Sequence, residues 1–398
     1  MKILVISQHY YPENFRITDI VESLVLSDND VTVLCGLPNY PKGYIYDGYK
    51  NKEHRDEYHH GVHIIRVKEI GRRNNIVFRF LNYWSYAHYG KRTINKLDKD
   101  YDVVLVNGLS PIMSALPGIK YAKKYHKPLI MYEMDLWPES LLAGGITHKS
   151  IIYKHYKRVS SNIYSKFDKI LVSTKEHIDY IKALPKCSSL DIEYLPQYAE
   201  DIFNGEHLDN NNDGTTINLM FAGNIGKAQS VDTIIKAANI LKDDKRFIFH
   251  IAGSGSELDN IKSLVNNLGL SNVIFYGQQP LSNMPNLYSK ADVMLVTLED
   301  KEYANKTIPG KIQSYMASGK PIIGSINGSG ASFIIDNNLG YVCPSNDVNG
   351  LVNIIKNINI DNLKQIGKHA YQVYLDKYNK ELFMNTLIAT LKGLKDNS

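Results

Sequence analysis

A lysine at the start of a short helical pattern is the first group in this sequence that suits chemistry. Ile308, Pro309 and Gly310 read as a turn, because proline disfavours helix at the residue before it. Lys311 then opens a run whose apolar residues are spaced like one buried helix face. A lysine beside the unpaired N–H groups of a helix N-terminus suits a bound anion. The same pattern is also compatible with a solvated lysine on an ordinary strand-to-helix connection.

Carboxylates beside a tryptophan form a second candidate cluster. The segment 133–140 (E-M-D-L-W-P-E-S) follows a strand predicted at 128–132. In this loop Asp135, with Glu133 beside it, is placed to orient or deprotonate a substrate hydroxyl. Acids at the start of a helix also act as caps, so a structural role is the alternative.

A third cluster combines cations with aromatic rings. The segment 72–92 contains five basic residues and no acid. Arg72, Arg73 and Arg79 are interleaved with rings that include Trp84. Such a helix suits a membrane interface, where rings lie at headgroup depth and cations lie near anionic lipid. A helix that packs its rings into a domain core has the same composition, and both interpretations stay open.

Length and composition are those of a soluble globular protein with two or three domains, since the 398 residues are 43% hydrophobic and 22% charged. The three cysteines have neither metal-ligand nor disulfide-framework spacing, which fits a reducing cytosol. We expect no signal peptide and no spanning helix, because no apolar run reaches about 18 residues. The net charge of +5 is too modest to favour nucleic acid as a partner. Residues 1–200 hold 28 Lys and Arg against 22 Asp and Glu, so the basic excess lies in this half.

The order of elements predicts an α/β chain of two tandem, Rossmann-like, doubly wound domains with a cleft between them. A buried-strand pattern at 2–7 precedes a loop at 8–16 and a helical pattern at 17–26. The same architecture restarts with a strand at 217–222 and a glycine-containing loop at 223–230.

The domain boundary is predicted where residues 196–215 lose hydrophobicity and gain Asn, Asp and Gly. We therefore predict domains at 1–200 and 201–379, with a C-terminal helix at 380–398 completing the first domain. We also expect the last strand of the first half at 169–174, and one long amphipathic helix over 371–394.

Ligands of doubly wound sheets bind at the carboxyl ends of strands. The loop at 8–16 leaves the first strand at that edge, so Glu13, Asn14 and Arg16 are candidates, although any first strand-to-helix loop would be polar. Gly253 and Gly255 follow a strand of the second half in a Gly-Ser-Gly run. The third glycine of the dinucleotide fingerprint is missing, so this run alone does not predict a dinucleotide site.

Several longer segments together resemble a known family. They are S-Q-H-Y-Y-P-E-N-F-R-I at 7–17, G-L-P-N-Y-P at 36–41, the 133–140 segment, F-A-G-N-I-G-K-A-Q at 221–229, and I-P-G-K at 308–311 with Y-M-A-S-G-K-P at 315–321. The chain resembles the GT-B glycosyltransferases, and specifically the retaining transferases of family 4, essentially from end to end. The resemblance is strongest to the WbuB-like branch of N-acetyl-L-fucosamine transferases in O-antigen and capsule assembly.

The resemblance implies a GT-B fold and retaining transfer from a UDP-sugar to a polyprenyl-diphosphate-linked saccharide in bacterial surface polysaccharide biosynthesis. N-acetylfucosamine or a related amino sugar is the implied donor sugar. The acceptor is expected on the N-terminal domain, and the enzyme on the cytoplasmic, inner face of the plasma membrane as a peripheral protein. No metal or other cofactor is expected, because lysines and helix N-termini can stabilise a leaving diphosphate.

Two departures from the family pattern affect the donor site. Many members carry an Arg and a Lys on the loop after the first strand of the second domain, where this chain has Asn224 and Gln229. Their Glu-x7-Glu pair, whose second Glu holds the donor ribose, falls on Lys306 and Ser314. Lys311 is therefore the best candidate cation for the diphosphate.

The candidate residues fall into three groups. Those predicted for the donor nucleotide and its diphosphate are Asn14, Phe15, Arg16, Gly223, Asn224, Lys227, Gln229, Gly253, Gly255, Lys306, Pro309, Gly310, Lys311 and Ser314. The predicted catalytic residues are Asp135, Glu133 and Lys311, and the predicted acceptor or membrane residues are Arg72, Arg73, Arg79 and Trp84.

Two other functions stay open. A GT-B enzyme of the UDP-sugar 2-epimerase kind would isomerise or release the sugar without an acceptor. A non-enzymatic nucleotide-binding scaffold would explain the missing Arg, Lys and Glu.

Overall fold

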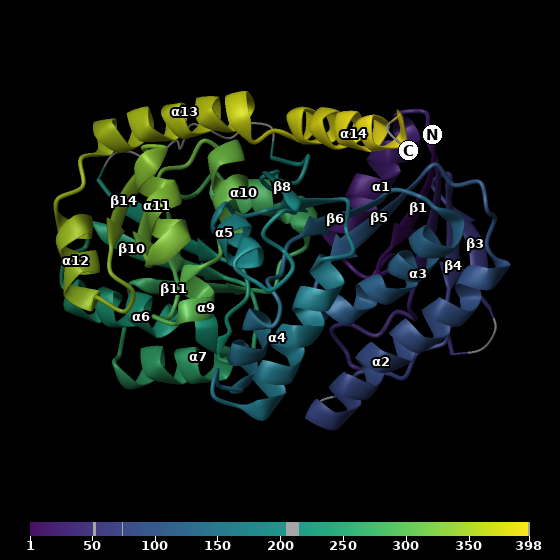
Figure 1. Cartoon of the computed structure of the whole chain (residues 1–398). Coiled ribbons are helices and arrows are strands. Elements are labelled where there is room, and N and C mark those ends of the chain that lie inside the picture. The colour runs from purple at the N-terminus through teal and green to yellow at the C-terminus, as the bar shows by residue number, and fades with distance from the viewer. Residues whose placement is uncertain (51–52, 74, 204–214, 397–398) are drawn as a thin grey trace. The chain divides into compact units, whose positions relative to one another are not determined.

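The computed structural model describes residues 1–50, 53–73, 75–203 and 215–396 (Figure 1). They divide into two compact units, Met1–Pro196 with Met384–Ser398 and Gln197–Phe383. Most of the predicted linker, 204–214, lies outside the described residues. Each unit is built on one sheet.

The first unit has an eight-stranded sheet in the order β3-β4-β2-β1-β5-β6-β7-β8, which is parallel except that β3 runs antiparallel to β4. Its strands are β1 (Lys2–Ile6), β2 (Asp30–Cys35), β3 (Asp56–His59), β4 (Val62–Arg66), β5 (Val103–Gly108), β6 (Leu129–Glu133), β7 (Lys169–Val172) and β8 (Asp191–Tyr194). In the centre, Val5 pairs with Val33 on one side and Leu105 on the other. Central parallel strands are buried on both faces, which explains their continuous apolar sequences.

Helices cover this sheet, and alternate strand residues point to opposite layers. The helices are α1 (Arg16–Leu26), α2 (Ile76–Thr93), α3 (Leu116–Tyr125), α4 (Ile151–Tyr164), α5 (Glu176–Lys182) and α14 (Lys380–Asp396), of which the last belongs mostly to this unit. Leu4 and Ile6 of β1 share one core with Tyr86 of α2, Tyr121 of α3 and Ile163 of α4. No described helix is both long enough and apolar enough to cross a bilayer.

The second unit has a six-stranded, fully parallel sheet in the order β11-β10-β9-β12-β13-β14. Its strands are β9 (Ile217–Ala222), β10 (Phe247–Ala252), β11 (Val273–Gly277), β12 (Val293–Thr297), β13 (Ile322–Ser325) and β14 (Gly340–Cys343). The chain builds outward from β9 in one direction and then returns to build outward through β12 in the other. This is the doubly wound arrangement, with its topological switch between β9 and β12.

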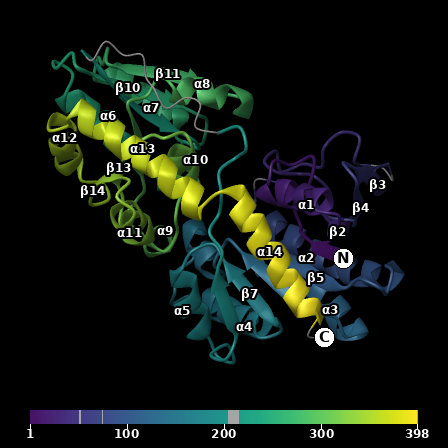
Figure 2. The same cartoon turned by 90° about the horizontal axis from the view of Figure 1, so that it is seen from above.

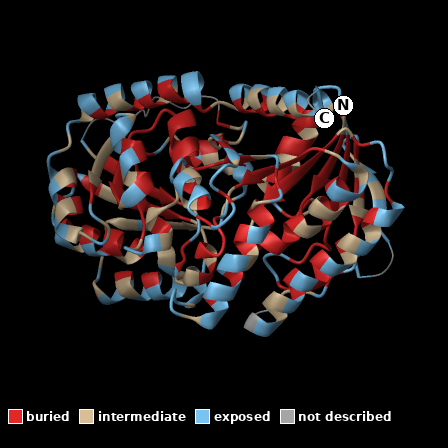
Figure 3. Ribbon diagram, in the orientation of Figure 1, coloured by how far each residue is buried: buried red, intermediate tan, exposed pale blue. Residues whose placement is uncertain are grey.

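Two helical layers enclose the second sheet. They contain α6 (Val231–Ile240), α7 (Leu258–Asn267), α8 (Met284–Tyr288), α9 (Glu302–Asn305), α10 (Lys311–Ala317), α11 (Gly328–Asp336), α12 (Val348–Lys356) and α13 (Ile360–Lys377). Leu219 and Phe221 pack in the layer of α6, α7 and α12, whereas Met220 and Ala222 pack in the layer of α10, α11 and α13. Figure 2 shows α13 lying alongside α10, and Figure 3 shows the central strands as the buried interior.

The predicted α/β fold of two doubly wound sheets is confirmed, but two predicted elements are wrong. The strand at 169–174 is not the last of the first sheet, because β8 follows it at the edge. The long helix predicted over 371–394 is two helices, α13 and α14. They separate at Tyr378 and Asn379, where the Asn379 side chain accepts a hydrogen bond of 2.8 Å from the Leu382 N–H and so starts a new helix.

Candidate functional site

The switch between β9 and β12 is where a doubly wound sheet binds ligands, and glycines shape it in this protein. A Cβ atom at Gly253 would lie 1.8 Å from the carbonyl oxygen of Gly223, and one at Gly255 would lie 2.3 Å from that of Ile225. Both Gly223 and Gly253 have positive φ, at 142° and 140°. The loops after β9 and β10 therefore pack backbone against backbone, with no space for side chains between them.

Lys311 points into this glycine-rich corner. From the first residue of α10, its Nζ reaches a point 3.8 Å from the centre of the Phe221 ring, at the end of β9. A Cβ atom at Gly223 would lie only 2.9 Å from Nζ. The residue as a whole is half-buried, but Nζ is sealed from solvent and has no hydrogen-bond partner among the described residues.

Burial lowers the pKa of Lys311 from 10.5 to about 7. Because Nζ is sealed from solvent, Lys311 is not the solvated first-turn lysine of the alternative interpretation. Because α10 is only seven residues long, the lysine charge rather than the helix dipole would be the main attraction for an anion. An unpaired, desolvated ammonium group interacts strongly with any anion that reaches it, since no water screens the pair.

Two polar side chains of the loop after β9 form a hydrogen bond with each other. Asn224 donates a hydrogen bond of 3.1 Å to the Gln229 side chain, so the positions that carry Arg and Lys in the resembled family form a neutral pair. Lys227 is exposed. Lys306 pairs with Glu302 at 2.8 Å.

The other candidates around the start of α10 differ in their exposure. Gly310 is exposed at the start of α10, and Pro309 is half-buried near Gly330. Ser314, one turn into α10, donates a hydrogen bond of 2.8 Å to the carboxylate of Glu200.

Glu200 is a candidate that sequence reasoning missed. It lies in the segment interpreted as a linker, and it reaches α10 across 114 residues of sequence. No local pattern predicts such a contact.

In the first unit, the loop after β1 is tied to the loop after β2. One carboxylate oxygen of Glu13 bonds His9 Nδ1 at 2.7 Å, and the other accepts from the Asn39 N–H at 2.6 Å. Phe15 stacks on His9 with ring centres 4.8 Å apart. Asn14 is exposed beside them, and Arg16 is the half-buried first residue of α1.

The two predicted catalytic carboxylates have different environments. Glu133, at the end of β6, is buried and bonds His177 Nδ1 at 2.6 Å. Asp135 is exposed, and its Oδ2 accepts a hydrogen bond of 3.2 Å from the Ser110 N–H. Asp135 is thus open to a substrate, whereas Glu133 is enclosed beneath it.

In the basic aromatic segment at 72–92, some aromatic rings are buried in the core and others are exposed. Tyr83 and Tyr86 of α2 belong to the core, as the packing interpretation predicts. Arg73 lies 4.0 Å from the Phe78 ring, and Trp84 is 41% exposed with its Nε1 3.3 Å from the Tyr156 hydroxyl.

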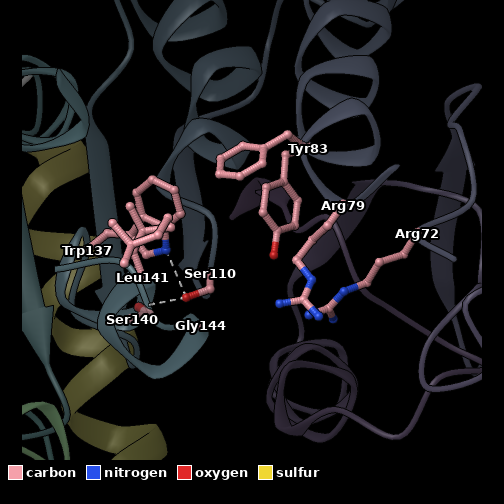
Figure 4. Close-up of a pocket in the computed structure, with 10 residues that line it drawn as sticks. Arg72, Arg79, Tyr83, Ser110, Trp137, Ser140, Leu141 and Gly144 are labelled. Atoms are coloured by element: carbon pink, nitrogen blue, oxygen red, sulfur yellow. Dashed lines mark hydrogen bonds between the residues drawn. The ribbon is translucent and has the colours of Figure 1, made fainter. Parts of the chain in front are cut away.

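Arg72 and Arg79 instead line a cavity of about 270 Å³ (Figure 4). Its other walls come from Tyr83 of α2 and from the loops after β5 and β6, including Ser110 and Trp137. The cavity lies at the carboxyl edge of the first sheet, where doubly wound domains bind ligands.

A possible metal-binding cluster lies elsewhere in the first unit. Glu22, His59 and His60 bring ligand atoms within 4.8 Å of one another. His60 precedes β4, so the cluster is at the amino edge of the sheet, opposite the predicted site residues.

Comparisons with known proteins agree with these observations. Residues 205–373 match the model of the family described as "Glycosyl transferases group 1". Over 318 residues the chain is 27% identical to the probable glycosyltransferase WbjE of Pseudomonas aeruginosa, covering 75% of this chain and 76% of that protein. Over 336 residues it is 23% identical to WcaI of Escherichia coli K12, a candidate glycosyl transferase of colanic acid biosynthesis, covering 80% and 82%.

Among solved structures, HepE from Anabaena in complex with UDP superposes with a TM-score of 0.74. The match covers 99% of this chain and 100% of HepE, at 14% sequence identity. At this identity the likeness establishes the fold.

Proposed function

We propose that this glycosyltransferase moves a sugar, with retention of configuration, from a UDP-sugar to a polyprenyl-diphosphate-linked saccharide in bacterial surface polysaccharide assembly. The UDP complex of HepE supports the donor class, and the colanic acid assignment of WcaI supports the polysaccharide class. The resemblance to the WbuB-like branch supports N-acetylfucosamine or a related amino sugar as the transferred group.

The observation that carries this proposal is the sealed, unpaired ammonium group of Lys311. It lies at the switch point of the second sheet, where glycines keep side chains away from it. Burying such a group without a partner destabilises a protein, so its presence at a ligand-binding edge favours a functional role. A diphosphate supplies the negative charge that this site lacks.

Transfer breaks the bond between the anomeric carbon and the diphosphate oxygen, and the electron pair leaves with UDP. The acceptor oxygen then bonds the anomeric carbon and loses its proton. Negative charge therefore grows on the diphosphate as the reaction proceeds, and Lys311 is placed to stabilise it. Lysine takes the part that a metal ion takes in other transferases, so metal-free transfer remains our prediction.

We assign Glu200 and Ser314 to the donor ribose. Ser314 stands where the resembled family has its ribose-binding glutamate, and Glu200 brings a carboxylate to that serine at 2.8 Å. A carboxylate accepts hydrogen bonds from hydroxyl groups, as ribose recognition requires.

In the first unit, we assign Asp135 to the acceptor hydroxyl or the donor sugar. Its carboxylate is exposed in the loop that follows β6. Glu133 is a positioning residue in this proposal. Its buried bond with His177 holds the end of β6 from which Asp135 projects.

We further propose that the enzyme is cytoplasmic and binds the inner face of the plasma membrane peripherally. Val77, Leu81 and Trp84 are exposed at i, i+4 and i+7 spacing on one side of α2. Ile151 and Ile152 are exposed at the start of α4, which packs beside α2 through Phe80 and Tyr156. Basic residues follow on α4 at Lys154, Lys157 and Arg158. Apolar tips beside cations are typical of interfacial docking surfaces.

Replacing Lys311 by methionine should stabilise the empty protein and weaken UDP binding. The lowered pKa means that the charged form disfavours folding at every pH below about 10.5, and fully so below about 7. We expect a higher Tm at neutral pH and a loss of UDP affinity of about one to two orders of magnitude, because a charged hydrogen bond contributes roughly 1.5–3 kcal/mol. Thermal unfolding and calorimetric titration with UDP measure the two effects.

Lys306→Met is the matched control for this experiment, since Lys306 already pairs with Glu302. It should bind UDP nearly as tightly as the wild type. Lys311→Arg should recover only part of the affinity, because the guanidinium group has a different shape and reach. A Lys311→Met protein that is less stable than the wild type and binds UDP normally would contradict the proposal.

Asp135→Asn should lower turnover by about 10²–10⁴-fold and leave UDP affinity unchanged. The amide keeps an oxygen that can accept from the Ser110 N–H, so the loop should stay folded. Asp100→Asn is the control, because this exposed aspartate pairs with Lys2. Turnover is measured with a UDP-sugar and a lipid-diphosphate acceptor, and near-normal turnover would leave Asp135 with a structural role only.

An altered free sugar formed without acceptor would favour an epimerase instead.

Changing Ile151 and Ile152 to Glu should abolish sedimentation with phosphatidylglycerol vesicles, because it removes apolar tips and adds negative charge. Leu26→Glu is the control, since Leu26 on α1 is equally apolar and 85% exposed. Equal vesicle binding by both variants and the wild type would exclude this docking surface.

A further inference from the structure

We propose that the cavity lined by Arg72 and Arg79 binds the phosphate group of the acceptor. This inference rests on the proposed function, because it takes the acceptor to be a lipid-diphosphate-linked saccharide. It separates Arg72 and Arg79, as ligand-binding residues, from Arg73 and Trp84 of the same segment.

The first argument is the charge of the cavity. Both arginines line the cavity, and Figure 4 shows their side chains pointing toward the same part of it. In the described parts of the chain, neither forms an ion pair, and Nε of Arg79 is buried without a hydrogen-bond partner. Two neighbouring cations repel each other, and a buried guanidinium nitrogen without a partner is unfavourable. A dianionic or trianionic ligand would remove both problems.

The second argument is a tyrosine hydroxyl group that faces the cavity. Tyr83 as a residue is only 6% exposed, and it lines the cavity together with both arginines. Figure 4 shows its hydroxyl directed toward Arg79, within the cavity. A tyrosine side chain that is mostly buried usually directs its hydroxyl toward a hydrogen-bond partner. A phosphate oxygen held by the arginines would accept its hydrogen bond, and bidentate guanidinium contacts suit the same group.

The opposite wall is prearranged and mainly apolar. Ser110 Oγ accepts a hydrogen bond of 3.0 Å from Trp137 Nε1 and donates one of 2.9 Å to Ser140 Oγ. Ser140 in turn donates to the Leu136 carbonyl at 2.8 Å. The hydrogen atoms of both serines are thus already used, and the indole ring is fixed in place. This wall suits the sugar or carrier part of the acceptor rather than a second anion.

The position of Asp135 indicates which end of the cavity would hold the phosphate of the acceptor and which end would hold its sugar. Its carboxylate bonds the backbone N–H of Ser110, a residue of the cavity wall. Negative charge there repels phosphate, so the phosphate belongs at the arginine end and the sugar at the Asp135 end. The hydroxyl to be glycosylated would then face the carboxylate assigned to it above.

A second pocket lined by basic residues differs from the arginine cavity in the features that a lipid-headgroup site requires. It is lined by Lys154, Lys157, Arg158 and Lys186, has a volume of about 470 Å³ and lies on the outer side of α4. Three of its cations lie on exposed positions of α4 and Lys186 lies after α5, whereas Arg72 and Arg79 line one cavity with the Tyr83 hydroxyl. We therefore assign the arginine cavity to the acceptor phosphate and not to bulk lipid.

Titration of the full-length protein with inorganic diphosphate tests the assignment. A Lys311→Met background removes the donor-site cation, so that diphosphate reports on the first unit. We expect Arg79→Gln and Arg72→Gln each to weaken diphosphate binding by about tenfold or more, and Tyr83→Phe by less. Arg73→Gln is the matched control and should leave binding unchanged. The Tm of each variant verifies that it is folded.

Three results would overturn the proposal. The first is unchanged diphosphate affinity in folded Arg79→Gln, and the second is no diphosphate binding before the arginines are changed. The third is a loss of phosphatidylglycerol vesicle binding in Arg72→Gln and Arg79→Gln, relative to Arg73→Gln, with diphosphate binding intact. That result would assign the cavity to lipid headgroups.

The arginine variants also separate this inference from the proposed function. With Lys311 present, Arg79→Gln should bind UDP normally and raise the KM for the lipid-diphosphate acceptor more than it lowers kcat. Failure of the diphosphate titration with normal UDP binding would remove the acceptor assignment alone. Failure of Lys311→Met to weaken UDP binding would remove the donor assignment and leave the cavity unaffected.

Discussion

The proposed donor site of the second unit depends on one unfavourable interaction, the desolvation of the Lys311 ammonium group. The Phe221 ring below it offers a cation–π contact at 3.8 Å, which offsets only part of the loss of hydration. Gly223 and Gly253 allow the neighbouring loops to close around the group without a side chain entering the corner. In our proposal, the empty protein holds a buried charge that a bound diphosphate neutralises, so that stability is exchanged for binding.

The first unit, in contrast, buries a carboxylate within a network of hydrogen bonds. Buried Glu69 accepts hydrogen bonds from Gln8 at 2.9 Å, from the Leu37 N–H at 3.2 Å and from Asn39 at 3.3 Å. Burial raises the pKa of Glu69 to about 7. Together with Glu13, which holds His9 and Asn39, it joins the loops that follow β1 and β2. These hydrogen bonds explain why the polar motifs at 7–17 and 36–41 contain so many buried side chains.

Sequence patterns predicted the central elements well because central strands and amphipathic helices carry strong local signals. The edge strand β8 escaped prediction because it is only four residues long, with one buried side chain, Ile192. Its exposed Asp191 and Glu193 pair with Lys169 of β7, a contact between strands that no local pattern predicts. The break after α13 escaped because the helical pattern continues through it. A single asparagine side chain decides where α14 begins.

The same division between local and tertiary information applies to the sites. Lys311 was predicted from the turn that precedes it, but its burial depends on Phe221, which is 90 residues away in the sequence. Glu200 escaped because its partner Ser314 lies in a distant helix. The basic aromatic segment could be recognised, yet only the packing of α2 separates the core ring of Tyr86 from the cavity-lining Arg79 and the exposed Trp84.

Proton uptake during UDP binding tests the central claim most directly. At about pH 8 most of the Lys311 side chain should be neutral in the empty protein, because burial lowers its pKa to about 7. UDP is already fully ionised there, since the second phosphate pKa is about 6. Calorimetric titration in buffers of different ionisation enthalpy should show uptake of nearly one proton, with UDP affinity falling as pH rises from about 7 to about 9, and Lys311→Met should show neither. Wild-type protein that binds UDP without proton uptake and with pH-independent affinity would contradict the account.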